Sequence, residues 1–208
     1  MKKAFIRSLS CLLSVVVVIG IFTTSQVLTV YAASPNQTAN FNKNYTVVPD
    51  NPGQTVVNIA QAQIGKNGYD LPYGEDWCAD FVSDCAELAG QSAAVPRHGR
   101  PDYLDGYIIG AGGYEVSKED AKPGDIAFYD FNSNYSPDHV EIVYSVSGNT
   151  VKTIGGNTGN DNFNYATVCN PRNPGSLLYI IRPNYKLTIK DVSNIYPVDS
   201  TYIFLKKR

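Results

Sequence analysis

The chain divides into a helical part and a strand-rich part, and this division constrains its fold more than any other feature. Up to Gly90, apolar residues recur at the three- and four-residue spacing of helices. From Pro123 onward, short β-branched and aromatic runs are separated by clusters of Asn, Gly, Ser and Pro, the pattern of an antiparallel meander. The runs are PGDIAFYDF, HVEIVYSV, TVKTIGG and SLLYIIRP. Helices followed by strands predict an α+β domain.

Two helices are predicted in the first part. Thr55 is a suitable N-cap for the segment VVNIAQAQI. The second helix is predicted to be capped by Asp76, to stop at Gly90 and to place Cys78 on its inward face at the first turn. Glycine and tyrosine are frequent in residues 91–122, where we expect irregular structure.

The two ends of the chain are predicted to lie outside this domain. Residues 1–32 join a basic start to an apolar run and small residues before Ala33, which is typical of a cleaved signal peptide. A retained anchor is the alternative, but polar residues interrupt the run short of the roughly 20 residues that a spanning helix needs. Residues 33–53 are expected to be a linker, 54–184 the catalytic domain, and 185–208 a strand-rich extension without an assignable role.

Charge and length narrow the class of protein. The chain has 17 basic and 19 acidic residues, and loss of the predicted signal peptide would leave a net charge of about −5 on about 176 residues. Such a chain suits one domain and argues against nucleic acid as a partner. Oligomeric state is not indicated by the sequence.

Three cysteines would remain after export, where disulfides can persist. These are Cys78, Cys85 and Cys169, so at least one thiol has no partner within the chain. Cys85 is expected either to pack in the core or to pair with Cys169. Cys78 is either a buried structural residue or a nucleophile.

The position of Cys78 favours chemistry, because N–H groups and the positive dipole end at a helix start stabilise a thiolate. The thiol also needs a base, and the candidates are His98, in the loop RHGR, and His139, at the start of HVEIVYSV. A rigid strand end holds a base better than a loop does, so we predict His139. The orienting group is either Asn157 or Glu141, and we favour Asn157 because a neighbouring strand can present it to the far ring nitrogen.

Four blocks of the sequence resemble the CHAP family, the cysteine, histidine-dependent amidohydrolases and peptidases of bacteria and their phages. The blocks are WCADFVSDCAELAG, PGDIAFYDF, DHVEIVYSV and IGGNTG, in the family's order. The resemblance implies a papain-like α+β fold of the NlpC/P60 superfamily, with N-terminal helices carrying the nucleophile on an antiparallel sheet carrying the histidine. It also implies cleavage of amide bonds in peptidoglycan by Cys78 as nucleophile, His139 as base and Asn157 as third member.

Two positions depart from the family pattern. Gly155 stands where many members have a glutamate two residues before the asparagine, so no acidic member carries over. Glu141 stands where a small residue is common, and it either compensates or shapes the cleft. We place Glu141 with Trp77 and Tyr73 among the expected substrate-binding residues.

No cofactor is expected to be required. The spacing of cysteines and histidines does not suit zinc, so we predict no metal site of that kind. Calcium is an open alternative, because some relatives bind it around the nucleophile helix and oxygen-rich loops suit that ion. The acidic residues near Cys78 are Asp70, Glu75, Asp76 and Asp80.

The predicted function is that of a secreted or wall-associated bacterial hydrolase, either an N-acetylmuramoyl-L-alanine amidase or a peptidoglycan endopeptidase. Its expected partner is peptidoglycan, with no membrane contact after signal removal. Three alternatives remain: an NlpC/P60-type peptidase, a catalytically inactive exported wall-binding or adhesion module, and a structural protein held by an intermolecular disulfide.

Overall fold

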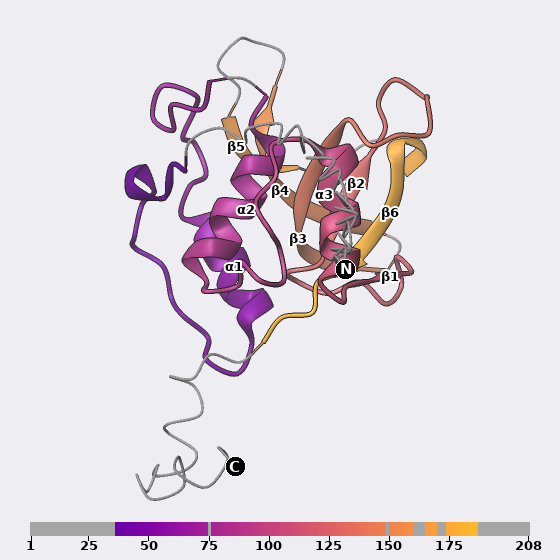
Figure 1. The fold of residues 1–208 in the computed structure, drawn as a ribbon, viewed down its shortest axis with the longest axis horizontal. Coiled ribbons are helices and arrows are strands. Elements are labelled where there is room, and N and C mark those ends of the chain that lie inside the picture. Colours follow the sequence, from indigo (N-terminus) through magenta and orange to yellow (C-terminus); the bar gives the residue numbers. More distant parts are fainter. Residues whose placement is uncertain (1–35, 75, 149, 160–164, 170–173, 187–208) are drawn as a thin grey trace, which may run out of the picture.

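The computed structural model describes residues 36–74, 76–148, 150–159, 165–169 and 174–186, and within them helices pack on a six-stranded sheet (Figure 1). The strand order is β1-β6-β2-β3-β4-β5, and each neighbouring pair is antiparallel. The predicted α+β architecture is therefore confirmed. The helices are η1 (Thr38–Asn40), α1 (Pro52–Gln61), α2 (Cys78–Leu88), α3 (Pro101–Gly110) and η2 (Pro174–Ser176), and the strands are β1 (Tyr114–Val116), β2 (Ile126–Tyr129), β3 (His139–Ser147), β4 (Thr150–Thr158), β5 (Tyr165–Cys169) and β6 (Leu177–Arg182).

The predicted signal peptide lies outside the described residues, as does most of the predicted C-terminal extension. In the extension, Tyr185 and Lys186 are described, and the Tyr185 hydroxyl donates a hydrogen bond to the Gly124 carbonyl at 2.7 Å. Within the described ranges, no helix combines the length and the apolar character needed to cross a bilayer.

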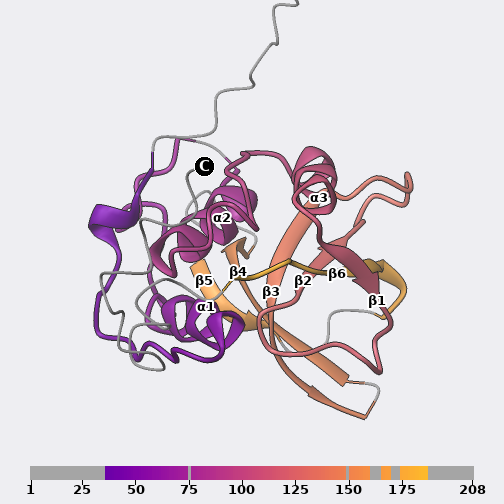
Figure 2. The same cartoon turned by 60° about the horizontal axis from the view of Figure 1, so that its bottom comes forward.

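The helices α1 and α2 pack together on the β3–β4 part of the sheet, whereas α3 lies against β6 (Figure 2). Phe81 and Val82 on α2 and Ile142 on β3 are fully buried in one apolar cluster. Burial of each such side chain contributes about 1.5–3 kcal/mol. This packing fixes the start of α2 above the start of β3, as the predicted fold requires.

Both predicted helix caps differ from the observed ones. Helix α1 begins at Pro52, and the Asn51 side chain caps it by accepting a hydrogen bond from the Gln54 N–H at 3.0 Å. Proline suits the first helical position because the N–H it lacks would have no partner within the helix. Thr55 lies inside the helix, where its hydroxyl donates to the Val48 carbonyl at 3.2 Å.

Helix α2 begins at Cys78, and its N-cap residue is Trp77, which makes no side-chain capping bond. The prediction that Asp76 caps this helix is therefore wrong. The Asp76 carboxylate instead accepts a hydrogen bond from Asn157 at the end of β4.

Residues 101–110, predicted to be irregular, form helix α3. Pro101 occupies the first turn, and Leu104 and Ile108 lie four residues apart and are fully buried. This anchored face outweighs the cost of Gly106 and Gly110 in the helix, each about 1 kcal/mol relative to alanine.

The four predicted runs form β2, β3, β4 and β6, but the predicted meander is wrong for the last of them, and β1 lies in the region predicted to be irregular. Strands β2, β3, β4 and β5 form a meander, while β6 lies between β2 and β1. Strand β5 was not predicted, and its addition extends the sheet beyond β4.

Part of the predicted linker packs on the domain. The Phe41 side chain is 4% exposed and contacts Phe81, with ring centroids 5.8 Å apart. The Gln37 N–H donates to the Asp84 carboxylate on α2 at 3.0 Å. Residues 37–41 therefore pack against α2, although the composition of the segment suggested that it has no core contacts.

Candidate active site

The first residue of α2 and the first residue of β3 meet in the interior. Cys78 is 2% exposed and His139 is 6% exposed. The Cys78 thiol lies close enough to the His139 imidazole to raise the pKa of the ring. The structure thus brings together the two residues that the sequence predicted as nucleophile and base. Cys78 is a free thiol, as is Cys85, which is fully buried, whereas the side chain of Cys169 lies outside the described residues.

The other ring nitrogen of His139 faces a carboxylate. Nε2 of His139 lies 3.1 Å from Oε1 of Glu141, which is fully buried. This contact leaves Nδ1 for the thiol. Glu141 was expected to line the cleft, but it lies inside the domain beside the imidazole, because its long side chain spans the two-residue offset along β3.

Asn157 lies in the left-handed region, with φ of 57°, near the end of β4. Its side-chain amide donates a hydrogen bond to Oδ1 of Asp76 at 3.1 Å. This bond ties the end of β4 to the residue that precedes the α2 N-cap. The carboxylate that contacts His139 therefore comes from Glu141, and the described bond of Asn157 stabilises the start of α2.

A chain of buried hydroxyl groups continues from Glu141. The Thr153 hydroxyl on β4 donates a hydrogen bond to Oε2 of Glu141, and it lies 3.2 Å from the hydroxyl of Tyr129 on β2. Sequence reasoning missed Thr153 and Tyr129. Their alternating positions on neighbouring strands were visible, but the strand register that places them beside Glu141 was not.

The surroundings of His139 favour its protonated form. Burial alone lowers the pKa of the imidazole, but the charge and hydrogen bond of Cys78, together with those of Glu141, raise the pKa to about 9. The carboxylate of Glu141 stabilises an imidazolium, so the arrangement favours a protonated ring of His139 beside the thiol of Cys78.

Trp77 and Tyr73, predicted to contact substrate, are 3% and 8% exposed. Their rings stack with centroids 5.2 Å apart and an interplanar angle of 13°. A Cβ atom on Gly156 of β4 would lie only 2.5 Å from the Trp77 ring. This close packing makes the two aromatic residues part of the wall that holds α2 on the sheet, and argues against direct contact with substrate.

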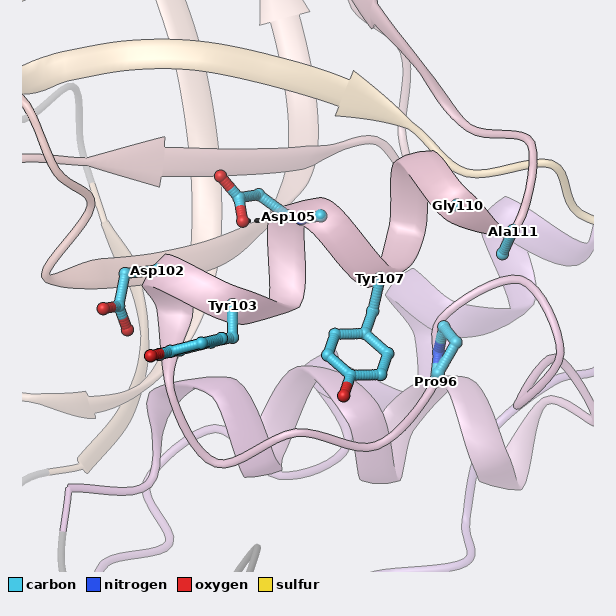
Figure 3. A pocket seen from close by; sticks show the side chains of 8 residues that line it. Pro96, Asp102, Tyr103, Asp105, Tyr107, Gly110 and Ala111 are labelled. Carbon is cyan, nitrogen blue, oxygen red and sulfur yellow. Dashed lines mark hydrogen bonds between the residues drawn. The ribbon is translucent and has the colours of Figure 1, made fainter. Parts of the chain in front are cut away.

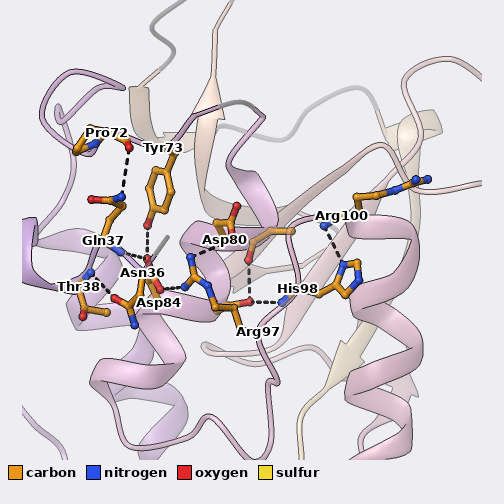
Figure 4. A network of polar contacts seen from close by, with 12 residues as sticks. Asn36, Gln37, Thr38, Pro72, Tyr73, Asp80, Asp84, Arg97, His98 and Arg100 are labelled. Atoms are coloured by element: carbon orange, nitrogen blue, oxygen red, sulfur yellow. Dashed lines mark hydrogen bonds and ion pairs between the residues drawn. The ribbon is translucent and has the colours of Figure 1, made fainter. Parts of the chain in front are cut away.

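An ion-pair network fills the opposite side of α2 (Figure 4). Arg97 contacts Asp84 and lies 3.0 Å from Asp80, and both carboxylates are almost fully buried. Asp84 also accepts a hydrogen bond from the Tyr73 hydroxyl at 2.5 Å. Burial, first of all, raises the pKa of that hydroxyl. The network fixes the loop that carries Arg97 to the nucleophile helix.

Three of the acidic residues considered for calcium have other partners in the structure. Asp80 is paired with Arg97, Asp76 accepts from Asn157, and Asp70 accepts from the Asn67 N–H at 3.0 Å. Glu75 lies outside the described residues. Among those that the structure does describe, no group of three or more acidic, histidine or cysteine side chains is arranged to hold a metal ion.

An open groove of about 570 Å³ lies along α3 (Figure 3). Tyr103 and Tyr107 project from the same side of the helix and are 43% and 46% exposed. The buried His98 ring packs against both of them, with centroids 5.3 and 5.2 Å away. The sequence showed that tyrosine is frequent in residues 91–122, but it did not predict the helix that aligns these two side chains.

The site lies within the part of the chain that matches a known family model. A family model described as the CHAP domain matches residues 66–157, a range that begins before α2 and ends at Asn157. The predicted likeness to the CHAP family is confirmed. The CHAP match contains Cys78, His139 and Glu141.

A solved structure described as similar to a lipoprotein of the NLP/P60 family, from Staphylococcus aureus subsp. aureus Mu50, is 18% identical to the chain. The similarity covers 70% of this chain and 45% of that one, with a TM-score of 0.45. No curated protein matches the chain.

Proposed function

We propose that this protein is a secreted bacterial hydrolase that cleaves an amide bond of peptidoglycan. The observation that carries the proposal is the buried contact between Cys78, at the start of α2, and His139, at the start of β3. The CHAP match over residues 66–157 supports the class of reaction and of substrate. The signal-like start of the sequence supports export to the compartment where that substrate lies.

In the proposed reaction, His139 takes the proton of the Cys78 thiol, and the thiolate attacks the carbonyl carbon of the amide. Backbone N–H groups at the start of α2 stabilise the negative oxygen of the tetrahedral intermediate. The imidazolium then gives its proton to the leaving nitrogen, the C–N bond breaks, and a thioester remains on Cys78. Water attacks the thioester with His139 as base, which releases a carboxylic acid and restores the thiol.

The dyad serves an amidase and an endopeptidase equally well, since both cleave an amide through the same acyl-enzyme. The product distinguishes them. Mass spectrometry of fragments released from purified sacculi would identify the new amine as that of a glycan-free stem peptide or as one within the peptide.

The proposal is tested with residues 33–208, which retain every described residue. We expect Cys78→Ser to lower the rate of dye release from labelled sacculi by at least about 10³-fold, because a hydroxyl is a far weaker nucleophile than a thiolate paired with imidazole. Cys85→Ala is the matched control on the same helix and should keep activity if it remains folded. Unchanged activity in folded Cys78→Ser would reject the proposal.

Thiol reactivity separates an enzyme from an inactive scaffold. In the proposed enzyme, iodoacetamide labels Cys78 quickly at neutral pH, and His139→Ala slows the labelling. Slow labelling in both proteins, without wall clearing, would instead indicate a wall-binding or adhesion module. A dimer on non-reducing electrophoresis would indicate the intermolecular disulfide.

A further inference from the structure

Glu141 is a buried carboxylate with two kinds of partner. One oxygen contacts Nε2 of His139 at 3.1 Å, and the other accepts a hydrogen bond from the Thr153 hydroxyl. Thr153 in turn contacts the Tyr129 hydroxyl. The hydroxyl groups of β4 and β2 thus hold the Glu141 carboxylate in place. The position of the carboxylate does not depend on whether the ring of His139 is protonated.

The space that Glu141 occupies exists because residue 155 has no side chain. A Cβ atom on Gly155 would lie 2.5 Å from Cγ of Glu141 and 2.7 Å from Oε1. Carbon atoms in contact normally stay about 3.5–4.0 Å apart, so any side chain at position 155 would displace the carboxylate.

Glycine is required at position 155 because a side chain there would collide with Glu141, and the requirement does not come from the backbone conformation. Gly155 is not among the described residues with positive φ, and it pairs with Thr167 of β5 directly before a register shift in that ladder. A larger residue could therefore adopt the backbone conformation of position 155, provided that the side chain at position 141 made room.

We propose that Glu141 is the positioning residue for His139, and that positions 141 and 155 form a reciprocal pair in which either strand can supply the carboxylate. A side chain at position 155 would start within the volume that Glu141 now fills, so a glutamate there could reach the same ring nitrogen from β4. This inference rests on the proposed function for its kinetic consequences, but the contact itself does not depend on that function.

The charge of Glu141, as well as its shape, has a role. A carboxylate accepts the Nε2–H of His139 and stabilises the imidazolium, while leaving Nδ1 directed at Cys78. Glutamine at position 141 keeps the volume but loses the charge, so it separates the electrostatic role from simple packing.

The first measurement is the pKa of the His139 imidazole by NMR in the wild-type protein and in Glu141→Gln, with His98 as an internal reference. We expect the pKa of His139 to fall by at least about one unit in the variant while the signals of His98 stay unchanged. An unchanged pKa of His139 in a folded variant would overturn the proposal. This measurement needs no enzymatic activity, so it can succeed even if the proposed function fails.

The second measurement is wall hydrolysis by Glu141→Ala, Gly155→Glu and the double variant Glu141→Ala/Gly155→Glu. We expect Glu141→Ala to reduce kcat by roughly 10- to 100-fold with little change in KM, and the double variant to recover at least about a third of the loss on a logarithmic scale. Gly155→Glu alone should be destabilised, because it forces two carboxylates into one volume. A folded double variant no more active than Glu141→Ala would overturn the reciprocal pairing, and if it does not fold, the Glu141→Gln titration decides.

Discussion

The two histidines of the chain are buried to almost the same extent but lie in different chemical surroundings. His98 is 7% exposed and His139 is 6% exposed. Nδ1 of His98 accepts a hydrogen bond from the Arg100 N–H at 3.1 Å, and its ring packs on two tyrosines. His139 faces a thiol on one side and a carboxylate on the other.

Burial alone therefore does not distinguish the histidine proposed as the base from the other one. The described partners of His98 are a backbone N–H and two tyrosine rings, which hold the imidazole in place. The partners of His139 are a thiol and a carboxylate, which the proposed proton transfer needs.

The largest expected effect separates the two histidines by activity. His139→Asn should reduce wall hydrolysis by at least about 10³-fold, because no base remains to activate Cys78. His98→Asn should keep activity within about 10-fold of the wild type, since it removes ring packing away from the thiol. Rates of dye release from labelled sacculi, with folding checked by circular dichroism, make the comparison. Equal losses in two folded variants would contradict the assigned difference.

The next effect concerns the loop that leads to His98. Arg97→Gln leaves the buried carboxylates of Asp80 and Asp84 without their cation, and we expect it to lower the free energy of unfolding by about 3 kcal/mol. Urea denaturation measures this loss. Arg100→Gln is the matched control, because its pair with Asp102 is exposed and should contribute less than about 1 kcal/mol. Similar losses in both variants would show that the network around Arg97 has no special structural role.

The smallest effect is a pH dependence of stability to which the imidazole of His139 contributes. The folded-state pKa of about 9 lies above the ordinary value of 6.5, so the protonated ring stabilises the folded protein. This contribution is fully present below about pH 6.5 and is lost as the pH rises through about 9, by at most about 3 kcal/mol. Urea denaturation between pH 6 and 10 should show the decline in the wild type and a smaller one in His139→Asn. Identical profiles for these two proteins would exclude the raised pKa.

The sequence was sufficient to predict that Cys78 lies at a helix start and His139 at a strand start, because these are local features with clear spacing. The choice between Asn157 and Glu141 depended on how β3 and β4 are paired and on the space above Gly155, which are properties of the assembled sheet. The contact between Glu141 and the ring of His139 also depends on the length and direction of the Glu141 side chain, which the sequence pattern does not give.

The distinction between local signals and properties of the assembled sheet also explains where the observed fold differs from the predicted one. Helix α3 left a readable signal in the spacing of Leu104 and Ile108, but the glycines around them suggested a loop. The insertion of β6 between β1 and β2 left no local signal, since the choice of a distant strand partner is made by packing of the whole domain. Trp77 and Tyr73 were assigned to substrate because aromatic residues near a nucleophile are ambiguous until their burial is known.

The close packing of Trp77 on Gly156 determines when, during folding, Cys78 can reach the imidazole of His139. Helix α2 can form from local contacts, but its first residue reaches the imidazole only after the helix has docked on a sheet whose strands are distant in sequence. An unfolded or newly synthesised chain therefore carries an ordinary cysteine and an ordinary histidine. Folding is therefore the step that assembles the proposed dyad of Cys78 and His139.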